Sequence, residues 1–149
     1  NQYKGECLFL RALTYHNLMI HYALPYKREG NNNYGMLIYT KAVNDPSQLA
    51  EQQSIGRSTV KETYDQILSD LNNAESMLPD IIDADKIGRA SKGAAIALKN
   101  ARNLHMRDWN NVVTEAKKLE GGRLFWKPIL PLLFVSYKDK SGIYILHSE

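Results

Sequence analysis

Cysteine is almost absent from this chain, since Cys7 is the only one in 149 residues. A single thiol excludes an internal disulfide and leaves the redox compartment of the protein open. Cys7 lies in an apolar helical stretch without an evident basic partner. We therefore expect it to pack in the core as a small hydrophobic side chain and not to act as a nucleophile or a lipid-anchored residue.

Long hydrophobic runs are also missing. The longest apolar run covers residues 129–135, far short of the roughly 20 residues that span a bilayer. The first residues contain no apolar stretch typical of a signal peptide. We expect that the chain does not cross a membrane and that this sequence carries no signal peptide.

Catalytic and metal-binding motifs are lacking as well. No serine lies in a Gly-x-Ser-x-Gly elbow, and the four histidines form no i,i+4 pair; they are expected to be exposed or hydrogen-bonded residues of helices: His16, His21, His105 and His147. Residues 83–88 begin like a calcium loop, but Ile87 and Ala94 occupy ligand positions. Asp65 and Asp70 project from different faces of one helix. The sequence predicts no enzyme, no metal site and no cofactor.

Charge of one sign does not dominate either, although the net charge is +3. Residues 57–85 contain two basic and seven acidic side chains, whereas residues 86–127 contain ten basic and three acidic ones. Adjacent segments of opposite sign are expected to attract each other when they pack. The basic residues are also interleaved with acidic and apolar ones, so no nucleic-acid partner is predicted.

What the chain does contain is helical periodicity. Residues 4–22 carry an apolar stripe at steps of three and four, formed by Leu8, Ala12, Tyr15, Leu18, Met19 and Tyr22. A second helix is expected to begin at Ser58 or Thr59, with Glu62 completing a capping box, and to end before Pro79. Its apolar stripe is expected to lie against the core.

Two further helices are predicted to form an antiparallel hairpin. One runs from Ser91, a good N-cap, to about residue 106, with small residues on one face: Ala94, Ala95, Ala97 and Ala101. The other begins after Asp108 and stops at Gly121. We expect more than half of residues 1–122 to be helical. The aromatic residues on the stripes are expected to be buried: Tyr15, Tyr22, Tyr64 and Trp109.

Residues 25–56 are expected to be a long irregular connection, because Asn, Gly and Asp-Pro-Ser segments interrupt them. Loops of this length are commonly functional or disordered. Tyr26, Tyr34 and Tyr39 lie here, near a run of asparagines. Aromatic faces beside amide groups suit sugar recognition, so these three are the candidate ligand-binding residues. The alternative is that they only pin the loop to the helices.

Three blocks of the sequence resemble one protein family in the family's own order. Residues 5–18, GECLFLRALTYHNL, resemble the pattern GEAxFLRAxxYxxL. Residues 57–71, RSTVKETYDQILSDL, are similar to RSTVxExYDxIxxDL. Residues 88–102 resemble GRATKGAAxALxAR, followed by a Gly-Asp-Trp turn in which Arg107 replaces the glycine. The family is SusD/RagB, the nutrient-binding surface lipoproteins of the Gram-negative outer membrane.

The resemblance implies a mainly α fold of tetratricopeptide-like helical hairpins, forming an α-α superhelix. It also implies a non-catalytic protein that binds a glycan or a peptide and passes it to a TonB-dependent transporter of the SusC type. The full-length protein would be lipid-anchored at the cell surface, in the outer membrane. A tetratricopeptide-like scaffold for protein interaction, with no ligand site of its own, is the alternative.

The resemblance fades beyond residue 122. Residues 1–122 are therefore expected to form the helical domain, and residues 123–149 a divergent, irregular or strand-like C-terminal segment, with a strand at 142–146. Members of this family are several times longer than 149 residues. We expect this sequence to be a fragment or a truncated member.

Overall fold

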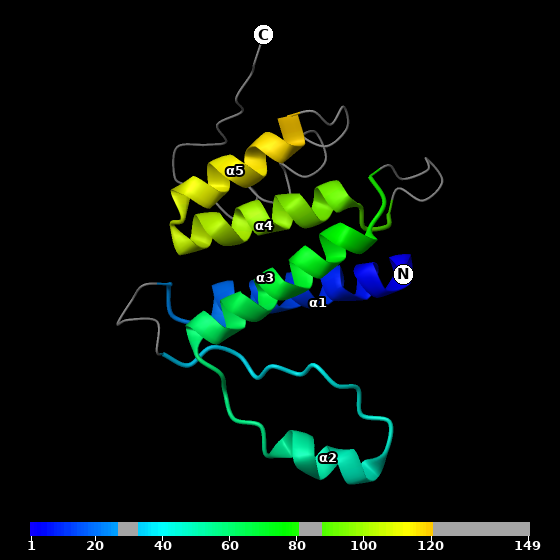
Figure 1. Ribbon diagram of the computed structural model, residues 1–149. Helices are drawn as coiled ribbons and strands as arrows, with labels where there is room; N and C mark the ends of the chain where they lie inside the picture. The colour runs from blue at the N-terminus through cyan, green and yellow to red at the C-terminus, as the bar shows by residue number, and fades with distance from the viewer. Residues whose placement is uncertain (27–32, 81–87, 121–149) are drawn as a thin grey trace.

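The computed structural model describes residues 1–26, 33–80 and 88–120. They form five helices (Figure 1): α1 Gln2–Tyr22, α2 Pro46–Gln53, α3 Val60–Met77, α4 Lys92–Met106 and α5 Trp109–Glu120. The described residues contain no strand, only an isolated bridge between Tyr34 and Thr59. The predicted mainly α fold is confirmed, and more than half of residues 1–122 are helical. The segment predicted at 123–149, with its strand at 142–146, lies outside the described residues.

The helix starts follow local hydrogen bonding, as the sequence predicts. Thr59 caps α3, and Glu62 completes the capping box by accepting from the Thr59 backbone N–H at 2.8 Å. Ser91 caps α4 by accepting from the N–H of Ala94 at 3.1 Å. These side chains satisfy backbone donors that a helix start leaves without partners. The starts of α3 and α4 are therefore fixed by residues within their first turn.

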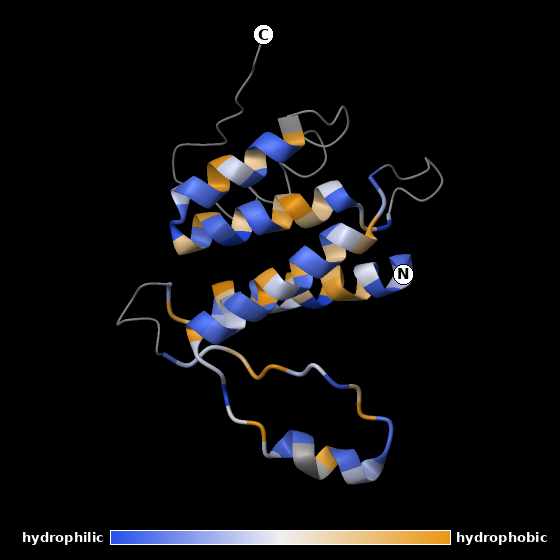
Figure 2. Cartoon of the chain, in the orientation of Figure 1, coloured by the Kyte–Doolittle hydropathy of each residue, from blue (hydrophilic) through white to orange (hydrophobic). Residues whose placement is uncertain are grey.

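The helices pack in two pairs. α1 packs against α3, α4 packs against α5, and α3 joins the pairs through its contact with α4, as Figure 1 shows. Apolar and polar residues alternate along α1, α3 and α4 (Figure 2), so that each helix can bury one face. The core takes its largest fully buried apolar side chains from α3: Val60, Ile67 and Leu71.

Two ion pairs and one glycine join α1 to the other two sequence blocks and to the end of α3. The Arg11 guanidinium on α1 donates to both carboxylate oxygens of Asp70 on α3, at 2.7 and 2.6 Å. Arg89 likewise donates to Glu6 at 2.9 and 2.7 Å. Gly5 lies so close to α3 that an added Cβ would stand 3.0 Å from Cβ of Met77. The three sequence blocks are thus partners in one packed interface.

The connection at 25–56 is not irregular throughout, which corrects the sequence-based prediction, because α2 lies within it. Asp45 caps α2 by accepting from the N–H of Ser47 at 2.8 Å, and Pro46 occupies the first turn. Proline at that position needs no hydrogen-bond donor, and its fixed φ suits a helix start. Asp-Pro-Ser therefore begins a helix here instead of breaking one. Figure 1 shows α2 projecting away from the other four helices.

Cys7 is exposed, which corrects the predicted core position. Gly5 faces α3, and two residues further along an α-helix turn the side chain by about 200°. Cys7 therefore points away from α3. Tyr22, also predicted to be buried, is 72% exposed because it is the last residue of α1. Tyr15 and Tyr64 are buried as predicted.

Candidate functional site

The segment carrying Tyr34 is held against the start of α3. The Gly35 N–H donates to the carbonyl of Ser58 at 2.6 Å, and the Ser58 N–H donates to the carbonyl of Met36 at 3.0 Å. The Met36 N–H donates to the Thr63 hydroxyl at 3.1 Å. A Cβ on Gly35 would lie only 2.3 Å from that hydroxyl oxygen, so the backbone approach requires glycine. Tyr34 is thereby presented from a fixed backbone.

Tyr34 offers an open aromatic ring. Its side chain is 72% exposed. The Arg57 guanidinium lies 5.8 Å from the ring centroid and also donates through Nε to the carbonyl of Gly35 at 2.9 Å. A cation at this distance interacts with one ring face. Tyr34 thus carries an accessible ring on a backbone segment that hydrogen bonds hold in place.

Tyr39 borders a different surface, an open groove along α1. Its backbone N–H donates to the Tyr15 hydroxyl at 2.7 Å, and its side chain is 40% exposed. The groove measures about 570 Å³ and is mainly apolar. Its lining comes from α1 and from the segment that follows Gly35: Leu10, Arg11, Thr14, Tyr15, Leu18, Met36, Leu37 and Tyr39.

Tyr26 belongs to a third place, beside the α4–α5 turn. Its ring packs edge to face on Tyr64, with 5.4 Å between centroids. It is half-buried and borders a hollow of about 430 Å³. The other lining residues come from the end of α4, the turn and the start of α5: Met106, Arg107, Asp108, Trp109 and Asn110. The structure therefore does not bring the three candidate tyrosines together in one site.

The predicted burial of Trp109 is wrong. Its place on the apolar stripe predicts burial in the core, but the side chain is 62% exposed. It is the first residue of α5, at the end of the hairpin, where no described helix covers it. Its helical spacing is correct, but periodicity gives no information on what lies beyond the end of a helix pair.

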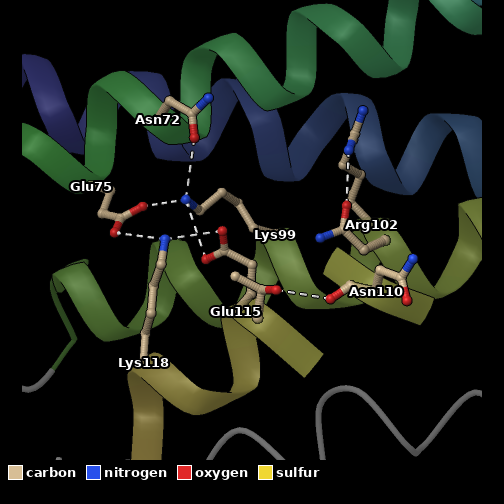
Figure 3. A network of polar contacts seen from close by, with 9 residues as sticks. Asn72, Glu75, Lys99, Arg102, Asn110, Glu115 and Lys118 are labelled. Atoms are coloured by element: carbon tan, nitrogen blue, oxygen red, sulfur yellow. Dashed lines mark hydrogen bonds and ion pairs between the residues drawn. The ribbon is translucent and has the colours of Figure 1, made fainter. Parts of the chain in front are cut away.

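A charged cluster holds the α4–α5 hairpin on α3 (Figure 3). The Lys99 ammonium is almost fully buried, forms an ion pair with Glu75 and lies 3.3 Å from Glu115. Lys118 reaches Glu75 at 3.5 Å and Glu115 at 3.0 Å. Burial raises the pKa of Glu75, but the hydrogen bonds and charges of Lys99 and Lys118 together outweigh it, so the net pKa is lowered. The predicted attraction between the acidic and basic segments is confirmed here.

One contact, between buried His16 and exposed His105, had no signal in the sequence. The rings of His16 on α1 and His105 on α4 meet edge to face, with 5.0 Å between centroids. His16 is buried and its Nδ1 has no hydrogen-bond partner, so it is neither exposed nor hydrogen-bonded through that atom. Burial lowers the pKa of His16 to about 4, with help from His105 and Arg102. Within the described residues, no cluster of three or more His, Cys, Asp or Glu could hold a metal ion.

No helix in the described ranges is both long and apolar enough to cross a bilayer. The fold and the open hollows define a helical-hairpin protein whose connecting segments present aromatic side chains outward. The sequence matches, over residues 1–102, the SusD-like family described as starch-binding and associating with the outer membrane. This match covers more than half of the chain, and the chain therefore belongs to the SusD-like family.

Solved structures agree with this assignment. The chain is 31% identical to a SusD-like protein from Bacteroides fragilis, with a TM-score of 0.61, covering 82% of this chain and 21% of that one. It is 30% identical to a SusD superfamily protein from the same organism, with a TM-score of 0.69 and coverage of 83% and 28%.

A laminarin-binding SusD-like protein is 28% identical, with a TM-score of 0.61 and coverage of 78% and 22%. The chain thus spans about a quarter of the length of these solved relatives. No curated protein shows a significant sequence match to it.

Proposed function

We propose that this chain is part of a non-catalytic surface protein that captures a glycan and passes it to a TonB-dependent transporter of the SusC type. The observation that carries the proposal is the family match, whose description is starch binding and association with the outer membrane. The laminarin-binding relative supports a glycan as the ligand. A lipid anchor on the full-length protein would keep it at the cell surface.

Tyr34 and Tyr39 are the proposed sugar contacts of the connecting segment. Both have accessible rings. Asn33 and Gly35, on either side of Tyr34, form backbone hydrogen bonds with Val60 and Ser58, and the Tyr39 N–H donates to the Tyr15 hydroxyl. Stacking on a sugar ring needs an aromatic face that is open yet held in place. Tyr26 contributes through the separate hollow at the α4–α5 turn.

A glycan array probed with the chain tests ligand binding, and Tyr34→Ala tests the site. Losing an exposed aromatic contact should weaken binding by about 1 kcal/mol, roughly fivefold in Kd, without lowering the melting temperature. Tyr22→Ala is the matched control, because Tyr22 is also 72% exposed but ends α1. Unchanged binding by Tyr34→Ala and Tyr39→Ala would contradict the assignment of these residues.

Handover is tested separately, by co-purifying the full-length protein with a TonB-dependent transporter of the SusC type from the same organism. A stable complex is the expected result. A protein that binds no glycan but captures other proteins would instead favour the scaffold function.

A further inference from the structure

The hollow at the α4–α5 turn combines ring faces with a cation. Trp109 is mostly exposed at its border, and Tyr26 also lines it, held by its packing on Tyr64. The hollow measures about 430 Å³, within the range of small-ligand pockets. An exposed tryptophan near a fixed tyrosine provides faces on which a flat or ring-shaped ligand can stack.

Arg107 occupies this hollow's edge in an unusual backbone conformation. It ends α4 in the left-handed region, with φ 58° and ψ 36°, and its N–H donates to the carbonyl of Leu104 at 3.0 Å. It is the only non-glycine residue with positive φ in the described part of the chain. This position commonly carries glycine, and a larger residue is less stable there by about 1 kcal/mol. Arginine thus places a cation here against the local backbone preference.

That cation is not matched by a carboxylate in the described residues. No described ion pair includes Arg107. The neighbouring Asp108 is engaged elsewhere, since its two oxygens accept from the backbone N–H and the side-chain Nδ2 of Asn111, at 3.3 and 2.6 Å. Asp108 therefore serves the start of α5, and the guanidinium remains available to a ligand.

We propose that this hollow binds a sugar residue that carries a carboxylate, with the sugar ring on Trp109 and the carboxylate on Arg107. Guanidinium groups match carboxylates in geometry and bind them through charge-assisted hydrogen bonds. The inference rests on the proposed glycan-binding function and specifies the class of sugar. Arg107 is then a specificity-determining residue, and the exposed ring of Trp109 is the surface on which the sugar stacks.

The test compares two probes that differ in charge: tetragalacturonate and the same oligomer with its carboxylates methyl-esterified. Calorimetric titration of the chain should show tighter binding of the acid by about tenfold, the lower end of what one charge-assisted hydrogen bond provides. Arg107→Asn should abolish that preference, because asparagine tolerates the left-handed conformation but carries no charge. Arg107→Lys should keep part of the preference for the acid, because lysine retains the positive charge.

Two further variants separate the site from general electrostatics and from folding. Trp109→Ala should weaken binding of both probes, since stacking does not depend on the carboxylate. Lys117→Ala removes an exposed cation from α5 that does not line the hollow, and it should change either Kd by less than about twofold. Equal losses for Lys117→Ala and Arg107→Asn, or an unchanged preference in Arg107→Asn, would overturn the proposal.

The outcome is also distinct from that of the proposed function. Binding of neutral glycans on an array, with no preference for tetragalacturonate over its ester, would overturn the acidic-sugar site and leave glycan binding standing. Failure to bind any glycan would overturn both.

Discussion

Arg11 and Asp70 join α1 to α3 through a two-point contact, in which Nε and Nη2 of the guanidinium each donate to one oxygen of the carboxylate. Asp70 is only 1% exposed, and Gln66 also donates to it at 2.9 Å. Both oxygens of the Asp70 carboxylate therefore accept hydrogen bonds from side chains of α1 and α3. Its hydrogen bonds hold α1 and α3 together.

Removing Arg11 alone should be costly, because it leaves a buried carboxylate without its counter-charge. We expect Arg11→Met to lower the free energy of unfolding by about 3 kcal/mol, measured by urea denaturation. The double variant Arg11→Met with Asp70→Leu should recover much of that loss, since no charge then stays buried. Strictly additive losses in this double-mutant cycle would show that the two residues are not coupled.

The close approach of the Gly35 backbone to α3 can be tested by comparing alanine substitutions at Gly35 and at Gly56. Gly35→Ala should lower stability by about 1 to 3 kcal/mol, because the new Cβ would stand 2.5 Å from the Thr59 carbonyl oxygen as well as near Thr63. Gly56→Ala should be neutral or slightly stabilising, since nothing lies within 4 Å of the place that its methyl group would occupy. Thermal denaturation of both variants measures this, and equal melting temperatures would contradict the packing at Gly35.

The two aromatic residues Tyr64 and Trp109 should differ in their effect on stability. Tyr64 is 4% exposed and Trp109 is 62% exposed. Truncating a buried aromatic side chain typically costs about 3 to 5 kcal/mol, so Tyr64→Ala should strongly lower the urea midpoint. Trp109→Ala should change the free energy of unfolding by less than about 1 kcal/mol. A large loss for Trp109→Ala would mean that its side chain is covered in solution.

His16 should make the chain sensitive to mild acid. In the folded chain burial lowers its pKa to about 4, below the ordinary value of 6.5. Between these two pH values the unfolded chain binds a proton that the folded chain does not, so the stability contributed by neutral His16 is complete above pH 6.5 and falls towards pH 4. The loss should reach about 2 to 3 kcal/mol.

Urea denaturation across this pH range measures the effect. His16→Phe should flatten the pH dependence, because it keeps an aromatic edge against His105 and removes the titrating group. The same change at His21, which is exposed on α1, should leave most of the slope in place. An unaltered slope in His16→Phe would assign the acid sensitivity to other groups, such as Glu75.

Features that depend on neighbours within one or two helical turns were predictable. The capping box of Thr59 and Glu62, the cap at Ser91 and the ends of α1, α3 and α4 all follow from such local contacts. α2 was missed because Asp-Pro-Ser is common at the start of helices as well as in turns. The family assignment was also available from the order of three sequence blocks.

The candidate site was less predictable, because exposure depends on residues far away in the sequence. The sequence by itself determined four of the helices, the caps of α3 and α4, and the family. Only the tertiary structure decided that Arg11 meets Asp70, that Cys7 faces away from α3, and that Tyr26 joins Trp109 and Arg107 at one hollow while Tyr34 and Tyr39 lie elsewhere. The physical reason is that helical periodicity fixes the face of a helix on which a residue lies, whereas burial is set by what the other helices bring to that face.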